Sequence, residues 1–156
     1  MKNYIPPEKR FKLILSVYLI LIKDGKTLLL RRQNTGYEDG NYGLVAGHAD
    51  GNEVAREALC REVLEESGLR FKPKDFRFVH LMHRKANDER VDVFFTADKW
   101  QGEPKIMEPE KCDDLSWFPL DNLPSNTIPY IRQAIECFQK GIYYSEFGWN
   151  ERAGNT

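Results

Sequence analysis

Three glutamates in the first half of the chain have a spacing that suits metal chemistry. Glu62 lies four residues before Glu66 and three before Glu65, so a helix would place all three carboxylates on one side. Like charges this close repel one another unless a cation lies among them. Carboxylate oxygens suit Mg²⁺, which keeps several waters and shares its coordination with substrate phosphates. The spacing therefore favours a magnesium site, with Arg61 adjacent to hold one carboxylate in place.

An acidic helix, taken alone, is more typical of a solvated surface than of a metal site. The wider pattern around the glutamates favours the site, because seven residues of a defined type stand at defined distances from one another along the chain. At average residue usage, a chance match has odds of about one in 10⁸ at each start position. The seven residues are Gly47, Glu53, Arg61, Glu62, Glu65, Glu66 and Gly68.

This pattern matches the Nudix box, G-x5-E-x7-R-E-U-x-E-E-x-G-U, at every defined position. The letter U stands for an aliphatic residue, and Val63 and Leu69 take that place. The chain therefore resembles the Nudix hydrolases, and their MutT-type members in particular. The stretch 107–111, followed by Trp117, resembles small cytosolic plant and human enzymes that hydrolyse nucleoside triphosphates and, in plants, isoprenyl diphosphates.

The resemblance implies a fold, a cofactor and a role for each residue of the box. The fold would be the Nudix α/β/α sandwich, a mixed sheet between helices, and the cofactor Mg²⁺, with Mn²⁺ as a substitute. Arg61 would orient the carboxylates, Glu53 would support them, and Glu65 would act as a further ligand or as a base through water. The implied metal ligands are the Gly47 carbonyl and the carboxylates of Glu62, Glu65 and Glu66.

Polar residues outside the box are candidates for substrate binding, each with a structural alternative. Arg32 ends a predicted strand and is either a phosphate contact or a surface cation. His48 follows Gly47 and either lines the substrate pocket or makes a structural hydrogen bond. Glu108 and Glu110 either supply an extra metal ligand or belong to a solvated loop.

Aromatic residues and one departure from the family pattern bear on the substrate pocket. Trp117 and Phe118 are expected in the core, with base stacking as the alternative. The aromatic tail 143–149 would cover either the pocket or another subunit. Many family members have Pro-Gly-Gly where this chain has residues 45–47, Val-Ala-Gly, so the approach to Gly47 is reshaped.

The remaining sequence predicts one mixed α/β domain over residues 1–156. Alternating or continuous apolar runs predict strands, and an apolar stripe of helical period predicts each of two helices. The first helix would start at a cap provided by Asn52 or Asp50 and end at Gly68. The predicted strands span 13–22, 27–32, 43–46, 76–83, 91–97 and 115–118, and the predicted helices 53–67 and 128–140.

Composition limits the classes of function. Lys and Arg number 23 against 24 Asp and Glu, which does not favour a nucleic-acid polymer as partner. Three scattered cysteines indicate neither a disulfide framework nor a zinc site. The first residues lack a secretory signal, and no apolar run is long enough for a membrane span, so a cytoplasmic protein is expected. The oligomeric state stays open, a homodimer included.

The sequence favours one reaction over several alternatives. It is the Mg²⁺-dependent cleavage of a nucleoside triphosphate, normal or oxidised, to a nucleoside monophosphate and pyrophosphate. Nucleotide sugars and isoprenyl diphosphates are alternative substrates for the same chemistry. A non-catalytic metabolite-binding module would be expected to lose box carboxylates, and none is lost here. An isomerase would need a pocket thiol, for which Cys60 is a poor candidate because it lies within the helix of the box.

Overall fold

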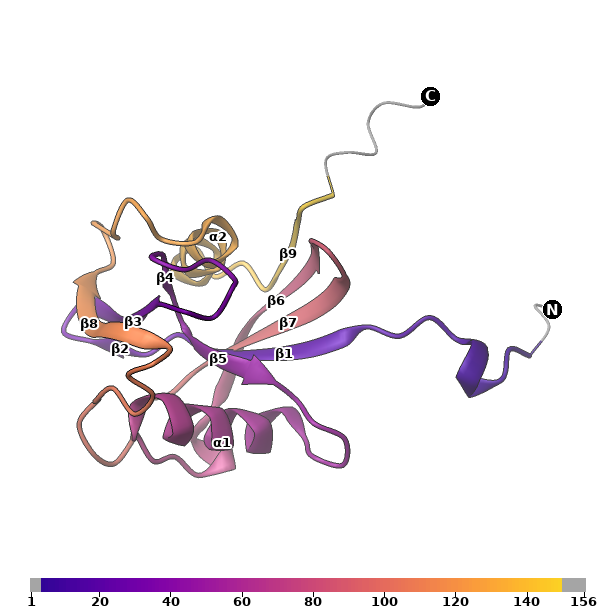
Figure 1. Ribbon diagram of the computed structural model, residues 1–156, viewed down its shortest axis with the longest axis horizontal. Helices are drawn as coiled ribbons and strands as arrows, with labels where there is room; N and C mark the ends of the chain where they lie inside the picture. Colours follow the sequence, from indigo (N-terminus) through magenta and orange to yellow (C-terminus); the bar gives the residue numbers. More distant parts are fainter. Residues whose placement is uncertain (1–3, 150–156) are drawn as a thin grey trace.

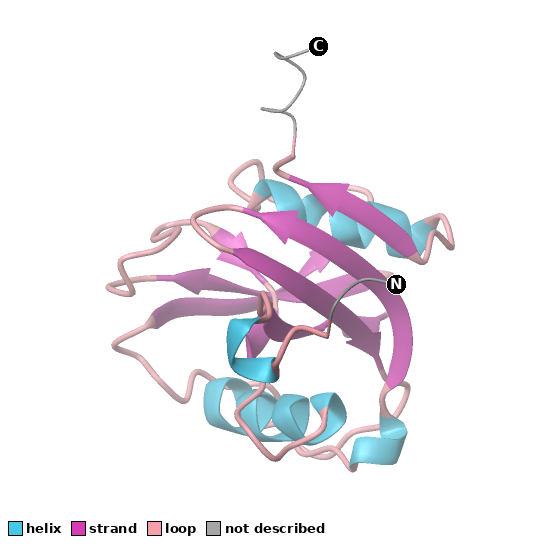
Figure 2. Ribbon diagram, turned by 90° about the vertical axis from the view of Figure 1, so that its right-hand side faces the viewer, coloured by secondary structure: helices cyan, strands magenta, loops and turns pink. Residues whose placement is uncertain are grey.

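A computed structural model describes residues 4–149 and shows two α-helices on opposite sides of a set of mixed strands (Figure 1). Figure 2 shows the same layers after a quarter turn, with strands between the helices. This arrangement is the predicted α/β/α sandwich. The strands are β1 (Ile14–Leu19), β2 (Ile22–Lys23), β3 (Lys26–Arg32), β4 (Tyr42–Gly43), β5 (Val45–His48), β6 (Arg77–Lys85), β7 (Glu89–Thr96), β8 (Cys112–Pro119) and β9 (Tyr144–Phe147). The helices are α1 (Ala55–Ser67) and α2 (Pro129–Gln139), with short 3-10 turns at Pro7–Lys9 and Pro73–Asp75.

The strands form two sheets. The larger runs in the order β5-β1-β7-β6-β9, with β1 parallel to β7, β6 parallel to β9 and the other pairs antiparallel. In the smaller sheet, β3 pairs with β2, β4 and β8, always antiparallel. Parallel and antiparallel pairs therefore coexist, as expected for a mixed sheet.

Two apolar cores lie on either side of β1, because alternate residues of this strand point to opposite faces. Val17, Leu19 and the following Leu21 pack with α1, whereas Tyr18 and Ile20 pack with α2. All five are buried, so both faces of this segment are covered. Strand β1 thus contributes side chains both to the core beneath α1, the helix of the Nudix box, and to the core beneath α2.

The predicted strands 13–22 and 43–46 were each wrong in one respect, because both break where the chain changes sheet. Ile20 still donates its N–H to Phe95 in the larger sheet, and the carbonyl of Leu21 already accepts from Leu28 in the smaller one. In the same way, Leu44 separates β4 in the smaller sheet from β5 in the larger one. Continuous hydrophobicity does not reveal such a transfer, since both sides of it are buried.

The start of α1 also differs from the prediction. The helix begins at Ala55, and the N–H of Val54 is capped by the Glu57 carboxylate at 3.3 Å rather than by Asn52 or Asp50. Asn52 instead takes a left-handed backbone, with φ 66°, in the turn before the helix. The predicted end is confirmed, because Gly68 has φ 71° and donates its N–H to Leu64.

Three further features complete the fold. Trp117 and Phe118 pack against opposite cores, so their placement in the core is confirmed. Strand β9, within the aromatic tail, was not predicted, and it pairs in parallel with β6. Among the described residues, no helix is long and apolar enough to span a bilayer.

Candidate active site

The candidate site lies where β5 meets α1, at a close contact between the Gly47 backbone and the Glu62 side chain. Gly47 lies so near Glu62 that a Cβ added to it would stand 1.9 Å from the Glu62 Cδ. Any side chain at this position would therefore displace the carboxylate. The glycine is needed for space rather than for an unusual backbone angle, and it lines the same cavity as the glutamates of α1.

Arg61 fixes the carboxylates at the start of this face. Its Nη1 donates to Glu62 at 2.8 Å, and its Nη2 donates to Glu53 at 2.7 Å and to the His48 carbonyl at 3.1 Å. Glu53 also accepts the N–H of Asp50 at 2.7 Å, which ties the turn before α1 to the same network. One guanidinium thus joins the helix, the turn and β5.

The two more buried glutamates are held in different ways. The Glu66 carboxylate accepts the Ala46 N–H at 3.1 Å, and burial raises its pKa to about 8. Burial also raises the pKa of Glu62, against the opposing effect of Arg61. Burying a carboxylate without enough positive charge costs free energy, and a bound cation would recover it. The electrostatics of the site therefore favour cation binding.

Glu65 differs from its two neighbours in being open to the cavity. Its side chain is 51% exposed, and its carboxylate lies 3.8 Å from Arg61. The Glu65 carboxylate makes no hydrogen bond to another described residue, and Arg61 is its ion-pair partner. Glu65 is therefore the carboxylate of the three that is free to meet a water molecule.

The carboxylates present hard oxygen donors of the kind that bind divalent metal ions. Among residues 4–149, no three acidic, histidine or cysteine side chains converge closely enough to hold an ion by themselves. They instead line one open cavity of about 590 Å³. Hard oxygen donors that leave room for water and phosphate are the arrangement Mg²⁺ favours. The cavity is lined by Arg32, Asn34, Thr35, Ala46, Gly47, His48, Asp50, Glu62, Glu65, Glu66, Glu108 and Lys111.

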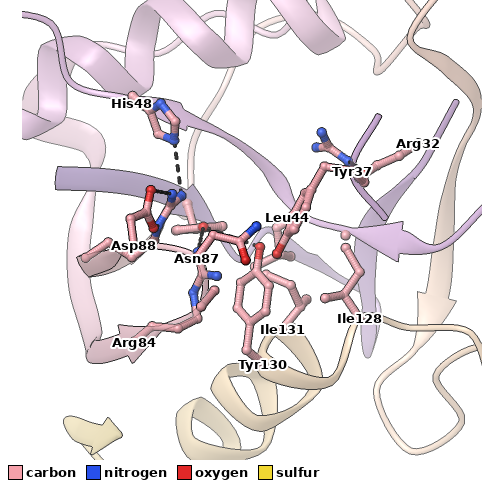
Figure 3. A pocket seen from close by; sticks show the side chains of 14 residues that line it. Arg32, Tyr37, Leu44, His48, Arg84, Asn87, Asp88, Ile128, Tyr130 and Ile131 are labelled. Carbon is pink, nitrogen blue, oxygen red and sulfur yellow. Dashed lines mark hydrogen bonds and ion pairs between the residues drawn. The ribbon is translucent and has the colours of Figure 1, made fainter. Parts of the chain in front are cut away.

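A second pocket, of about 330 Å³, adjoins this carboxylate cavity (Figure 3). We call it the side pocket. Arg32 and His48 line both, so a ligand can extend from one into the other past these two side chains. The other lining residues come from β1, the loop 33–41, the junction of β4 and β5, the hairpin of β6 and β7, and the start of α2 with the residue before it. They include Tyr18, Tyr37, Leu44, Arg84, Asn87, Asp88, Arg90, Ile128, Tyr130 and Ile131.

Of the predicted site residues, all but Arg61, Glu53 and Glu110 line the carboxylate cavity, the side pocket or both. Arg32 also braces the loop after β3, because it donates to the Tyr37 carbonyl at 2.8 Å and to the Thr35 hydroxyl at 3.2 Å. His48 lies with its Nε2 3.4 Å from Nη1 of Arg90. Glu108 lines the carboxylate cavity and pairs with Lys111 at 2.9 Å, whereas Glu110 does not line it.

Several residues near the site were not predicted from the sequence to belong to it. Lys111 enters the cavity because the loop 108–111 is tied to the loop after β3, where Gln33 donates to the Pro109 carbonyl at 2.6 Å. Arg84 and Tyr130 come from elements far along the chain and belong to no motif. Cys60 lines neither space, and neither does any residue of the aromatic tail 143–149.

Comparison with known proteins identifies the family. The NUDIX domain profile matches residues 12–137, so the chain belongs to the NUDIX family. The fold agrees: a MutT NUDIX hydrolase from Burkholderia pseudomallei superposes with a TM-score of 0.74 at 28% identity, covering 81% of this chain and 98% of that one. The NUDIX domain of Shewanella oneidensis NrtR, solved with ADP ribose, gives a TM-score of 0.68 at 23% identity, covering 88% and 93%.

The curated relatives are named after different substrates. The NAD-capped RNA hydrolase NudC of Shigella dysenteriae is 28% identical over 122 residues, 78% of this chain and 46% of that one. The ADP-ribose pyrophosphatase of Methanocaldococcus jannaschii is 33% identical over 106 residues, 67% of this chain and 61% of that one. The chain thus spans about half the length of the curated relatives it matches.

The contact between Gly47 and Glu62 predicts a sharp difference between two glycines. Gly47→Ala should lower the free energy of unfolding by about 1–3 kcal/mol, because the new methyl group overlaps the Glu62 side chain. Gly51→Ala is the matched control, since a Cβ there meets nothing within 4 Å. Urea unfolding of both variants measures the effect. Equal stability of the two would show that β5 and α1 do not meet in this way.

The raised pKa of Glu66 predicts a pH-dependent stability. A carboxyl whose pKa is higher in the folded protein binds more protons when folded. The free energy of unfolding therefore falls as pH rises from the ordinary value of 4.5 through about 8. Glu66→Gln removes this loss, so in excess chelator the variant should melt several degrees above the unchanged chain at pH 8, with a smaller difference at pH 5. Exposed Glu136→Gln is the control. A lower melting temperature for Glu66→Gln at both pH values would contradict the assignment.

Proposed function

We propose that this chain is a Mg²⁺-dependent pyrophosphohydrolase that cleaves the diphosphate linkage of a nucleoside triphosphate. The products would be a nucleoside monophosphate and pyrophosphate. The observation that carries the proposal is the junction of two spaces, one lined by carboxylates and one by aromatic and apolar groups, at Arg32 and His48. A phosphate chain with an organic group at one end has the same division of charge.

The ligands proposed for the metal are the Gly47 carbonyl with Glu62 and Glu66, and Glu65 is either a further ligand or the base. A bound Mg²⁺ would neutralise phosphate charge and lower the pKa of a coordinated water. Arg32 and Lys111 face the same cavity and would bind phosphate oxygens that the metal leaves free. Arg61 would keep Glu62 in position throughout, because it is anchored to Glu53 and to the His48 carbonyl.

Glu65 is the proposed base. Glu62 is engaged by Arg61 and Glu66 by the Ala46 N–H, so their oxygens are already partly used. The Glu65 carboxylate is the most exposed of the three and can accept a proton from the attacking water. Attack at a phosphorus between the metal site and the side pocket would leave the nucleoside monophosphate on the side-pocket side.

A second candidate substrate is a nucleoside diphosphate joined to another group, such as ADP-ribose. The names of two relatives, an ADP-ribose pyrophosphatase and an NAD-capped RNA hydrolase, favour this alternative. The balance of 23 basic and 24 acidic residues supports a free small molecule over a polynucleotide end. The chemistry at the carboxylates would be the same for either substrate.

A substrate panel tests the reaction. Purified chain is incubated with nucleoside triphosphates, ADP-ribose, NAD and a capped RNA, with Mg²⁺ or with excess chelator. We expect a triphosphate to give monophosphate and pyrophosphate, with ¹⁸O from labelled water in only one of the two, and no turnover in chelator. Inorganic phosphate as the sole first product would contradict the proposed bond cleavage. Full turnover in chelator would contradict the metal requirement, and a higher kcat/KM on RNA ends than on any nucleotide would contradict the small-molecule preference.

The proposed base predicts a separation of activity from stability. Glu65→Gln should lower kcat by about 10²–10⁴ while the melting temperature changes little, because the side chain is exposed and weakly paired. Glu136→Gln, an exposed glutamate of α2 far from the carboxylates in sequence, should retain kcat. Activity in the Glu65 variant equal to that of the control would assign the base to another group.

A further inference from the structure

The side pocket has two chemically different walls. Helix α2 contributes Ile128, Tyr130 and Ile131, which provide apolar and aromatic surface. The hairpin of β6 and β7 contributes the polar side chains of the opposite wall, Arg84 among them. Figure 3 shows Arg84 and Asp88 on one side of the space, Arg32 and Tyr37 on the other, and Tyr130 between them.

Arg84 differs from the charged side chains beside it in this pocket, because it is only 3% exposed whereas Arg90 and Asp88 are 17% and 38% exposed. Its Nε donates to Asp92, and its Nη2 donates to Asp92 at 3.4 Å and to the Tyr18 hydroxyl at 3.3 Å. The Tyr130 ring lies over the guanidinium, 3.8 Å from Cζ to the ring centroid. One edge and one face of the group are thus fixed, and its orientation toward the pocket is fixed with them.

The remaining edge of this guanidinium has no partner within residues 4–149. No hydrogen-bond acceptor among these residues contacts Nη1 of Arg84, and Nη1 is not one of the buried side-chain atoms that lack a partner, so this nitrogen is open to the side pocket. A buried ion pair seldom adds more stability than apolar residues of the same volume. An ion pair kept here, with two N–H groups unpaired at a pocket, therefore points to a ligand.

The charges around the pocket decide what kind of acceptor this ligand presents. Arg84 is paired with Asp92, and Arg90 is paired with Asp88 through both its Nε and its Nη2. Each guanidinium on this wall is therefore neutralised by its own carboxylate. Such a wall offers hydrogen-bond donors without a surplus of positive charge, which suits a neutral carbonyl oxygen better than a phosphate or a carboxylate.

We propose that Arg84 determines substrate specificity by donating from Nη1 to a carbonyl oxygen on the ring of a nucleobase held in the side pocket. The ring would lie among Tyr130, Ile131 and Leu44, in the space drawn in Figure 3. The site would thus select 6-oxopurines or 4-oxopyrimidines over the corresponding amino bases. This inference rests on the proposed function for the presence of a nucleotide.

An amino group at the same ring position would bind poorly for a definite reason. Its N–H groups would face those of Arg84, so both sets of donors would lose water without gaining an acceptor. An unpaired buried donor costs about 1–3 kcal/mol, which corresponds to a factor of roughly tenfold or more in affinity. The pairing with Asp92 prevents Arg84 from turning away to avoid the contact.

Binding of nucleoside monophosphates tests the selectivity without requiring turnover. Calorimetric titration of the full chain with IMP and AMP, in Mg²⁺, compares two ligands that differ at position 6 and in the N1 proton. We expect IMP to bind about tenfold more tightly. A second pair, UMP and CMP, shows whether the pocket takes purines, pyrimidines or both. Equal affinity within both pairs, tighter binding of the amino bases, or no binding of any of the four would overturn the proposal. A preference for IMP in a chain that hydrolyses no diphosphate would refute the proposed function alone.

A variant pair assigns the selectivity to Arg84. Arg84→Lys keeps a positive charge beside Asp92 but removes the planar donor edge, so the ratio of the IMP and AMP affinities should fall to within about threefold of unity. Arg31→Lys makes the same exchange at an exposed ion pair with Asp113 outside the pocket and should keep the original ratio. A folded Arg84→Lys chain that retains the tenfold ratio would show that another group reads the base. If that variant does not fold, the affinities of the unchanged chain for the two nucleotide pairs still decide the selectivity.

Discussion

The close contact between the backbone at Gly47 and the side chain of Glu62 is the constraint on which the rest of the structure depends. It leaves room for the Glu62 carboxylate against β5, in the cavity that Glu65 and Glu66 also line. Arg61 completes the joint, because it binds Glu62, Glu53 and the His48 carbonyl at once. The acidic face can exist only because glycine leaves room for it and a single arginine compensates part of its charge.

The fold surrounds this joint with two layers that serve different purposes. Helix α1 carries the carboxylates, and helix α2 supplies Tyr130 and part of the apolar wall of the side pocket. Strand β1 belongs to both, since its alternate residues enter opposite cores. The chain crosses from one sheet to the other near Leu21 and again at Leu44, and the second crossing brings the loop after β3 and strand β5 to the two spaces.

The carboxylate face could be predicted from the sequence, but the side pocket could not. Glu62, Glu65 and Glu66 lie within two turns of one helix, so their spacing alone places them together. Arg84 and Tyr130 meet only after β6 pairs with β7 and α2 packs on them, and neither residue repeats a local period. Hydrophobic patterning was enough to predict which of the predicted segments are helices and which are strands. The points where a strand breaks and the chain enters the other sheet depend on tertiary contacts, and these do not change the hydropathy of the segment.

Arg32 both stabilises a loop and lines the carboxylate cavity and the side pocket, and this double role limits how the substrate specificity of the protein could change. The same guanidinium braces the Thr35–Tyr37 turn and lines the boundary between the carboxylate cavity and the side pocket. A mutation that reshapes the loop 33–41 would therefore move a wall of each space together. New substrates would be reached more readily through changes in the β6–β7 hairpin or in α2, where side chains such as Asn87 and Ile128 line the side pocket without lining the carboxylate cavity.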